Sequence, residues 1–364
     1  MTELDAVLAR MRERADPGGG VRFDAFMDTA LYAPDVGYYR RSGRTLGRAG
    51  DFYTASHVSP LFGWCLAERL LAAHRRAGAP DGFTVVELGA GDGTLAFDLI
   101  ARLRRRLPDV SRWRYIAVEP SAPLRALAAE ALRGSSDPRL TIELVADLPS
   151  TPPVAGCLLA NELLDALPAR RFRRTVEGWR ELAVRWDAGR PTEILEPSAP
   201  MVTPSVALPD AVVGATLDLS PIAEGTIRGF ADVLHRGEVI LLDYGRDETD
   251  WTRRPGSGTL RAYRSHTVQL DPYSEPGNAD LSVFVNFDRL RRAASLAGFR
   301  ELSFQPQARA LGAWGFAELQ NEWMAQAPDT PERVRRQLAA KSLLFGFENF
   351  WALELATSEL PQDD

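Results

Sequence analysis

The sequence predicts an α/β protein with a Rossmann-like, mostly parallel central sheet, and three observations lead to this fold class. Short apolar runs alternate with helix-compatible stretches from about residue 83 to residue 186, as a parallel sheet requires. The run at 84–88 leads through a glycine-rich turn into a predicted helix over 94–106. Three successive runs end at or beside the acids Glu87, Glu119 and Asp147, on the edge where doubly wound sheets bind ligands.

The segment before this region is predicted to be mostly helical. Residues 1–14 mix acids and bases around Val7 and Met11, which favours an amphipathic helix over a secretory signal or a transit peptide. A Gly/Pro-rich stretch at 16–20 and a Gly/Arg-rich loop at 37–50 interrupt the helical pattern. Because no targeting pattern is visible, we expect a cytoplasmic location.

The segments after the alternating region are predicted from composition and periodicity. Residues 187–225 are rich in proline and lack a helical period, so we expect an insertion or a loosely structured connector. The run at 238–245 predicts a further buried strand that again ends in an acid and a glycine. Residues 287–297 predict a helix. Residues 299–304 and 347–356 predict late strands, which we expect to pair as an antiparallel hairpin at the sheet edge.

The composition is that of an ordinary globular protein and excludes several classes. Of 364 residues, 45% are hydrophobic and 25% are charged. The net charge of −6 gives no indication of nucleic-acid binding, and no run of 18 apolar residues predicts a membrane span. Cys65 and Cys157 lie far apart in apolar runs, so we expect buried free thiols and no metal site. Three aromatic residues have spacings that suit core packing: Phe62, Trp64 and Phe97.

The glycine-rich turn, with Gly89, Gly91 and Gly93, is suited to contact a ligand through its backbone. Glycines adopt positive φ and lack the Cβ atoms that block close approach, and the following helix offers free N–H groups. A dinucleotide motif requires a glycine where Thr94 stands, and no lysine follows the turn as a P-loop requires. The E-x-G-x-G-x-G form is instead the one that S-adenosylmethionine (SAM) methyltransferases use.

The acids around this turn favour a cationic ligand. Glu87 and Asp92 would repel a pyrophosphate, whereas the amino-acid end of SAM carries an ammonium and a sulfonium. Glu119, at the end of the second strand, is placed to bind ribose hydroxyls. Asp147, past the third strand, is placed to meet the adenine. The sequence therefore favours SAM as cofactor; the alternatives are a glycine turn without a ligand and, for either later acid alone, a solvated strand end.

Five further segments bear on the family. They read LYAPDVGYY at 31–39, GDFYTASHVSPLFG at 50–63, ANELLDALP at 160–168, LDYG at 242–245 and GTLRAY at 258–263. With the glycine turn, they resemble the MidA-like (DUF185) family of SAM-dependent methyltransferases, relatives of the mitochondrial complex I assembly methyltransferases. The resemblance runs from about residue 23 to residue 305 and keeps the order and spacing of the motifs.

This resemblance implies a class I SAM-dependent methyltransferase fold: a seven-stranded, mostly parallel sheet with an N-terminal helical cap and an inserted subdomain. Characterised mitochondrial members methylate an arginine side chain on a respiratory complex I subunit. We accordingly divide the chain into four parts. These are a helical cap and cofactor lid (1–75), a SAM-binding core (76–186), an insertion or connector (187–225), and the remainder of the core with substrate-side segments (226–364).

The sequence departs from the family pattern in two places. Ser56 and His57 stand where the family usually has Pro-Glu, and Phe284 and Asn286 replace a histidine and an aspartate. These positions lie in segments expected to face the cofactor or the substrate. The departures therefore leave the methyl acceptor open.

Residues 161–165 are the predicted catalytic segment, because they follow the apolar run at 154–160, at the carboxyl end of the fourth strand. In this fold class that edge lies beside the transferable methyl group. We predict that Glu162 orients or deprotonates the acceptor and that the amide of Asn161 positions it. Asp165 would lie near Glu162 if a helix starts here. The alternative for Asn161 and Asp165 is capping of that helix.

The resemblance implies further site residues. The loop with Asp51 and Thr54 is implied to close over SAM, with a surface turn as the alternative. His57, in the same loop, would serve as a base near neutral pH, with a structural role as the alternative. Three more residues are predicted to contact the substrate, with packing or a local hydrogen bond as the alternative for each: Asp243, Tyr244 and His266.

Three functions follow as hypotheses. The resemblance favours a protein arginine methyltransferase. The altered segment at 280–287 favours a small-molecule N- or O-methyltransferase. The third hypothesis is a catalytically silent SAM-binding assembly factor. We expect a protein or small-molecule methyl acceptor, no nucleic-acid or membrane partner, and leave a homodimer open.

Overall fold

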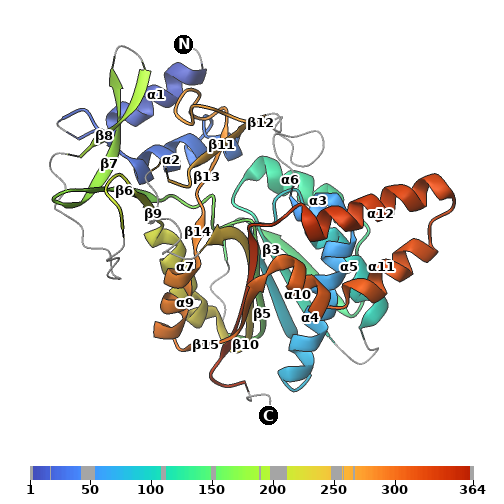
Figure 1. Ribbon diagram of the computed structural model, residues 1–364. Coiled ribbons are helices and arrows are strands. Elements are labelled where there is room, and N and C mark those ends of the chain that lie inside the picture. Colours follow the sequence, from blue (N-terminus) through green and yellow to red (C-terminus); the bar gives the residue numbers. More distant parts are fainter. Residues whose placement is uncertain are drawn as a thin grey trace.

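The computed structural model describes residues 3–16, 18–41, 54–107, 112–148, 153–187, 190–196, 211–246, 256, 258–264 and 267–360. Its centre is a sheet of strand order β15-β16-β10-β5-β2-β3-β4, with the short β14 (Val285–Asn286) added beside β10 (Figure 1). The seven strands of the main path are β2 (Phe83–Leu88), β3 (Trp113–Val118), β4 (Leu140–Val145), β5 (Val154–Asn161), β10 (Leu234–Arg246), β15 (Phe299–Pro306) and β16 (Phe350–Thr357).

The strand directions confirm the predicted fold class. β10, β5, β2, β3 and β4 are mutually parallel, and β16 runs antiparallel between β10 and β15. The strand order reverses at β2, which pairs with β3 on one side and β5 on the other. Such a switch point opens a crevice at the carboxyl ends of the strands, where ligands bind in doubly wound folds.

Helices cover both faces of this sheet because successive strand residues point to opposite sides. Val85 and Cys157 face one core, which includes α4 (Leu61–Arg76), α5 (Thr94–Arg106) and α10 (Gln307–Ala313). Val86 and Leu158 face the other, with α7 (Pro221–Val233) and α9 (Phe287–Leu296). α6 (Ala122–Ala131) lies beside β4.

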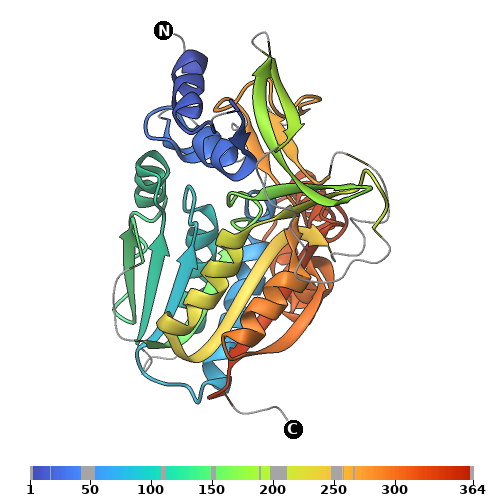
Figure 2. The ribbon, with the colours of Figure 1, turned by 90° about the vertical axis from the view of Figure 1, so that its left-hand side faces the viewer.

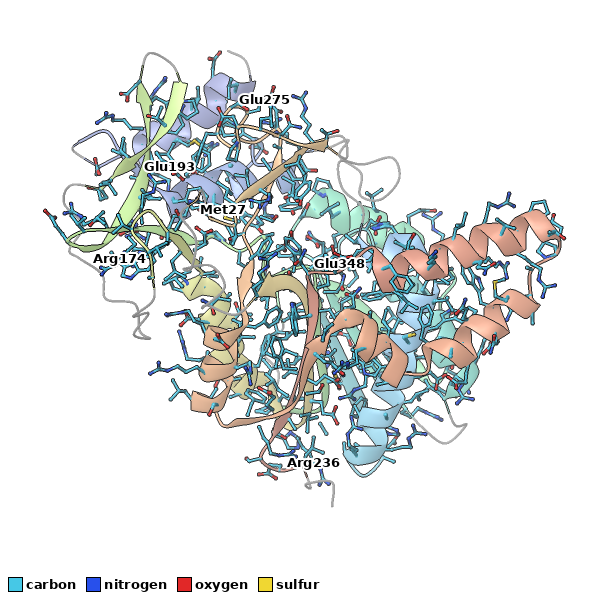
Figure 3. All side chains as sticks on the ribbon, viewed as in Figure 1. Met27, Arg174, Glu193, Arg236, Glu275 and Glu348 are labelled. Atoms are coloured by element: carbon cyan, nitrogen blue, oxygen red, sulfur yellow. The ribbon has the colours of Figure 1, made fainter. Side chains whose placement is uncertain are left out.

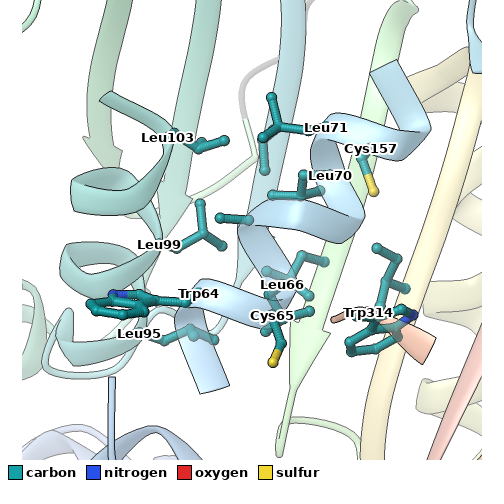
Figure 4. Packing of buried hydrophobic residues seen from close by; sticks show 14 of the residues in the cluster. Trp64, Cys65, Leu66, Leu70, Leu71, Leu95, Leu99, Leu103, Cys157 and Trp314 are labelled. Carbon is teal, nitrogen blue, oxygen red and sulfur yellow. The ribbon is translucent and has the colours of Figure 1, made fainter. Parts of the chain in front are cut away.

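Figure 4 shows the first of these cores, a buried cluster to which Leu66, Leu70, Leu99 and Trp314 belong. A fully buried leucine such as Leu70 contributes about 1.5–3 kcal/mol relative to an exposed one. Cys65 and Cys157 are buried free thiols, as predicted, and burial raises the pKa of both.

A second layer lies over the carboxyl edge of the central sheet (Figure 2). It holds an antiparallel sheet of order β1-β7-β6-β9 with β8 beside β7, and a small sheet of order β12-β11-β13. Two helices, α1 (Glu3–Glu13) and α2 (Phe23–Tyr32), share a hydrophobic core with these strands. The strands are β1 (Val21–Arg22), β6 (Arg170–Thr175), β7 (Gly178–Asp187), β8 (Arg190–Leu195), β9 (Thr216–Leu219), β11 (Arg261–Arg264), β12 (Thr267–Val268) and β13 (Asp280–Ser282).

The structure corrects the interpretation of the middle of the chain. Parallel alternation does not continue to residue 186, because a two-residue turn joins β6 to β7 and forces an antiparallel pair. The segment at 187–225 is also more regular than expected, since β8 and β9 pair with this sheet and α7 begins at Pro221. Ser220 caps α7 with Pro at its first position, a helix start that the proline-rich composition concealed.

Other predicted elements have mixed outcomes. The helices predicted over 1–14, 94–106 and 287–297 are confirmed as α1, α5 and α9. β15 and β16 do pair antiparallel, but three helices separate them, so they are not a tight hairpin. These helices are α10, α11 (Phe316–Ala325) and α12 (Thr330–Phe345).

Of the three aromatic residues expected in the core, two are buried and one is exposed. Phe62 and Trp64 are buried, but Phe97 is 45% exposed and the prediction for it was wrong. Its neighbours Ala96, Leu99 and Ile100 occupy the buried face of α5, which turns position 97 toward the opposite side. Within the described ranges, every helix is too short or too polar to span a bilayer.

Candidate active site

The turn after β2 has the backbone conformation that the glycine pattern predicts. Gly89, Gly91 and Gly93 have φ of 71°, 58° and 82°, a region that favours glycine. A Cβ on Gly93 would lie 2.8 Å from the Cα of Ala128, so this glycine allows α5 and α6 to approach. Gly93 does not line the adjoining cavity, whereas Gly89 and Gly91 do.

A cavity of about 360 Å³, here called the glycine-turn cavity, opens where β2, β3 and β5 end. Much of its polar lining comes from the turn, the strand ends and the segment at 54–57. Its apolar lining comes mainly from the segment after β5, with single residues of α5, α6 and α7. Among the predicted cofactor residues, it contains Thr54, Glu87, Gly89, Gly91 and Glu119.

Two buried carboxyl groups shape this cavity. Glu119 accepts hydrogen bonds from the N–H groups of Gly91 and Ser121, at 2.9 and 2.7 Å. Glu87 accepts one from the Tyr115 hydroxyl at 2.8 Å. Burial raises the pKa of Glu119 and raises that of Glu87 to about 8. Both groups would be favoured in their ionised form by a cation placed in the cavity.

Two further residues were predicted to bind the cofactor. Asp147 is exposed beyond the end of β4 and does not line the glycine-turn cavity. Asp51 lies outside the described residues.

The short helix α3 (Ala55–Val58) connects the glycine turn to the catalytic segment. His57 places Nε2 3.0 Å from Oδ2 of Asp92 and Nδ1 2.6 Å from Oγ1 of Thr54. Two residues before His57, the N–H of Ala55 donates to Oε1 of Glu162 at 3.0 Å. Both ring nitrogens of His57 are thus engaged, and this geometry fits a residue that holds α3 in place.

Asn161 and Glu162 meet at the end of β5 in a strained turn. Glu162 has a φ of 51°, which is uncommon for a residue with a side chain. Burial, with a smaller contribution from the charge of Asp243, raises the pKa of Glu162 to about 8. Oδ1 of Asn161 is buried at the glycine-turn cavity and has no hydrogen-bond partner among the described residues. No helix starts here, so the capping alternative for Asn161 and Asp165 was wrong.

A second cavity of about 640 Å³, here called the acid-lined cavity, adjoins the first. Tyr39 and Glu162 line both, so the cavities meet at these two side chains. Four carboxyl groups line the second cavity, and its described lining includes no arginine, lysine or histidine. The four are Glu162, Asp165, Asp280 and Glu348, the last labelled in Figure 3.

Aromatic side chains form much of the remaining wall. Tyr244, predicted to line the acceptor pocket, lines the acid-lined cavity, and its ring centroid lies 4.0 Å from that of Phe284. Tyr39, in the 3-10 helix η1 (Tyr38–Arg40), donates from its hydroxyl to Oδ1 of Asp280 at 2.7 Å. Burial, followed by the charges of Asp243 and Asp280, raises the pKa of Asp165 well above its ordinary value.

Asp243 lies behind this wall. Its carboxylate accepts hydrogen bonds from the N–H groups of Leu163, Leu164 and Tyr244, at 3.2, 2.7 and 2.8 Å. It therefore fixes the turn after Glu162 and does not line either cavity. His266 lies outside the described residues.

Tyr39 and Asp280 are site residues that were not predicted. Tyr39 stands at the end of the family-like segment 31–39, and Asp280 stands at the start of the altered segment 280–287. The departures in the second segment do not reach either cavity. Phe284 is buried beside Arg246 and Arg261, and Asn286 caps α9 by accepting from the N–H of Arg289.

Comparison with known proteins bears directly on this site. Residues 65–305 match the model of a family described as "Putative S-adenosyl-L-methionine-dependent methyltransferase". The chain belongs to this family. It is a SAM-dependent methyltransferase of the MidA-like group, and the resemblance drawn from the sequence is confirmed.

Relatives and solved structures of this family agree. A crystal structure from Burkholderia thailandensis, bound to S-adenosyl-homocysteine, superposes with a TM-score of 0.83 at 27% identity and covers 99% of this chain and 94% of that one. The protein arginine methyltransferase NDUFAF7 of Xenopus tropicalis is 28% identical over 82% of this chain and 74% of its own length. The human protein of that name is 29% identical over 76% of this chain and 66% of its own length.

The residues present fit the SAM cofactor of this family. The glycine turn lets the backbone approach a ligand, and Glu87 and Glu119 place two carboxyl groups in the same cavity. The unpartnered oxygen of Asn161 is a buried acceptor that a cationic amino group would satisfy.

Proposed function

We propose that this chain transfers a methyl group from SAM to an arginine side chain of a protein. The observation that supports the acceptor is the acid-lined cavity: three carboxyl groups that are buried or partly buried and the exposed Glu348 line it, and its described lining includes no arginine, lysine or histidine. Buried carboxyl groups that repel one another are costly unless a cation joins them. A guanidinium keeps its charge at any physiological pH and offers five N–H donors.

The proposed roles follow from the place of each group. When bound, SAM supplies an electrophilic methyl group on a sulfonium. Glu162 stands where the two cavities meet, so it would orient the guanidinium and accept a proton from it as its nitrogen is methylated. Asp165 and Asp280 would hold the remaining N–H groups from the far side, with Tyr39 fixing Asp280. Because the acceptor would be held in line with the methyl group, most of the catalysis would come from orientation.

On the cofactor side, we propose that Glu119 holds the ribose and that Glu87 and Asn161 face the cationic end of SAM. Thr54 would line the lid. The animal relatives are named protein arginine methyltransferases, which supports arginine over other cationic acceptors. The cavity of about 640 Å³ leaves room for the residues that flank an arginine in a peptide.

The test is the fate of the transferred methyl group. The purified protein would be incubated with radiolabelled SAM and a cell lysate, and the labelled material separated into proteins and small molecules. The proposal expects label in a discrete protein band that yields methylarginine on acid hydrolysis. Label in small molecules alone would favour a metabolite methyltransferase. Binding of SAM without any transfer would favour the silent assembly factor.

The binding of SAM at the glycine turn can be tested separately with the substitution Gly91→Leu. Position 91 has positive φ and lines the glycine-turn cavity, so a branched side chain would both strain the turn and fill the space. Calorimetry should detect no binding of SAM, while circular dichroism stays that of a folded protein. Gly298→Leu, at another positive-φ glycine with open space around it, controls for backbone strain alone. Unchanged affinity in Gly91→Leu would mean that SAM does not touch this turn.

A further inference from the structure

An unpartnered helix face leads into the acid-lined cavity. Helices α11 and α12 project from the body as an arm (Figure 1). Val334, Leu338 and Phe345 of α12 are 51%, 61% and 66% exposed. Their spacing of four and seven residues puts them on one face of the helix, while Leu343 on the opposite face is buried in the core.

This face is continuous with the proposed acceptor site. Phe345, the last residue of α12, lines the acid-lined cavity together with Ser342. From Val334 to Phe345 the stripe is about 16 Å long, at 1.5 Å per residue. Two other exposed apolar residues, Val176 and Leu270, lie away from this helix and line neither cavity. Single exposed apolar residues are normal on a protein surface, whereas an aligned set that ends at a site is not.

The charges beside the stripe indicate what kind of partner fits it. Lys341 is exposed within the stripe, and Arg333 and Arg335 are exposed on its two sides. Arg335 and Arg336 both form ion pairs with Glu332, so this single carboxylate neutralises only part of their combined positive charge. An apolar stripe with basic borders is complementary to an amphipathic helix that has acidic borders.

We propose that this face of α12 is the docking surface for the acceptor protein. The partner would present an amphipathic helix of about three turns, with apolar residues at i, i+3 or i+4, and i+7 and acidic residues beside them. The docked helix would end near Phe345 and deliver the neighbouring arginine into the acid-lined cavity. This inference rests on the proposed protein acceptor and adds how that acceptor is chosen.

The experiment uses two substrates once the labelled protein has been identified: the intact acceptor protein and a nine-residue peptide centred on its methylated arginine. Leu338→Glu and Val334→Glu should each raise KM for the intact protein at least about tenfold, as the loss of a central apolar contact does. The kcat value and the kinetics on the peptide should not change. Leu296→Glu, at a residue 76% exposed on α9, is the matched control and should leave both substrates unaffected.

Other results would overturn the inference. Equal KM values for wild type and both stripe variants on the intact protein would remove α12 from recognition while leaving the arginine acceptor standing. A wild-type dimer that Leu338→Glu converts to monomer in light scattering would assign the stripe to a second copy of this chain. If no protein is labelled by the wild type, the proposed function fails, and this inference fails with it.

Discussion

The two cavities of this protein are neighbours, yet they are built in different ways. The glycine-turn cavity takes Glu87, the glycines and Glu119 from one stretch of about three dozen residues, and its carboxyl groups are held by N–H and hydroxyl donors. The acid-lined cavity is assembled from segments between residues 39 and 350, and, besides burial, the charges of its Asp280 and Glu162 help to raise the pKa of its Asp165. In the first, hydrogen-bond donors stabilise each carboxylate, whereas the carboxyl groups of the second would repel one another when ionised unless a cation joined them.

The largest expected effect lies at the junction of the cavities. Glu162→Gln keeps the shape of the side chain and the hydrogen bond from Ala55 but removes the proton acceptor. Methyl transfer under single-turnover conditions should fall about 10²–10⁴-fold, the usual cost of losing a general base, with SAM affinity little changed. Glu348→Gln, a more exposed carboxyl group of the same cavity, is the control and should have a much smaller effect. Near-normal turnover in Glu162→Gln would remove this residue from the chemistry.

The second effect is a dependence on pH. Glu162 must be ionised to accept a proton, and its pKa of about 8 keeps it mostly protonated near neutrality. At subsaturating SAM, the transfer rate should therefore rise about tenfold per pH unit up to about pH 8. At saturating SAM the rise should end at a lower pH, because a bound cation favours the carboxylate. A flat rate between pH 6 and 8 at subsaturating SAM would exclude titration of this group from the rate.

Stability should change with pH in the opposite direction. The pKa of Glu162 in the folded protein lies above its ordinary value of 4.5, so the folded state holds more protons than the unfolded state between these values. Its contribution to stability is present below about pH 4.5 and is lost as the pH rises through 8. Glu87 and Asp243, with pKa values raised to about 8 and 7, act in the same direction. The melting temperature should fall from pH 5 to pH 8, and less steeply in Glu162→Gln.

The contrast between the cavities also explains what could be predicted from the sequence. Glu87, Gly91 and Glu119 were identified because a contiguous strand, turn and strand end leave a local pattern. Tyr39 and Asp280 were missed because their hydrogen bond joins positions 241 residues apart, and no local pattern records that pairing. The same difficulty applies to Asp243, since an acid at a strand end has the same sequence pattern whether it binds a ligand or fixes a turn.

A third effect tests the acceptor side alone. Asp280→Asn keeps an oxygen for the Tyr39 hydroxyl but removes a buried negative charge. A hydrogen bond to a charged group contributes about 1.5–3 kcal/mol. Losing this free energy of acceptor binding should raise KM for the acceptor roughly 10- to 100-fold. Affinity for SAM should stay the same. Tyr39→Phe, which removes the Tyr39 hydrogen bond to Asp280 without changing the charge, should have a smaller effect. Equal KM values in wild type and Asp280→Asn would remove Asp280 from acceptor binding.

The smallest effect is expected on the cofactor side, at Asp147. This residue was predicted to meet the adenine, but it is exposed and lies outside the glycine-turn cavity. Exposed charges are screened by water and contribute at most about 1 kcal/mol. Asp147→Ala should therefore weaken SAM binding in calorimetry by no more than about fivefold. A much larger loss would mean that the cofactor site extends past the end of β4, and that the glycine-turn cavity holds only part of it.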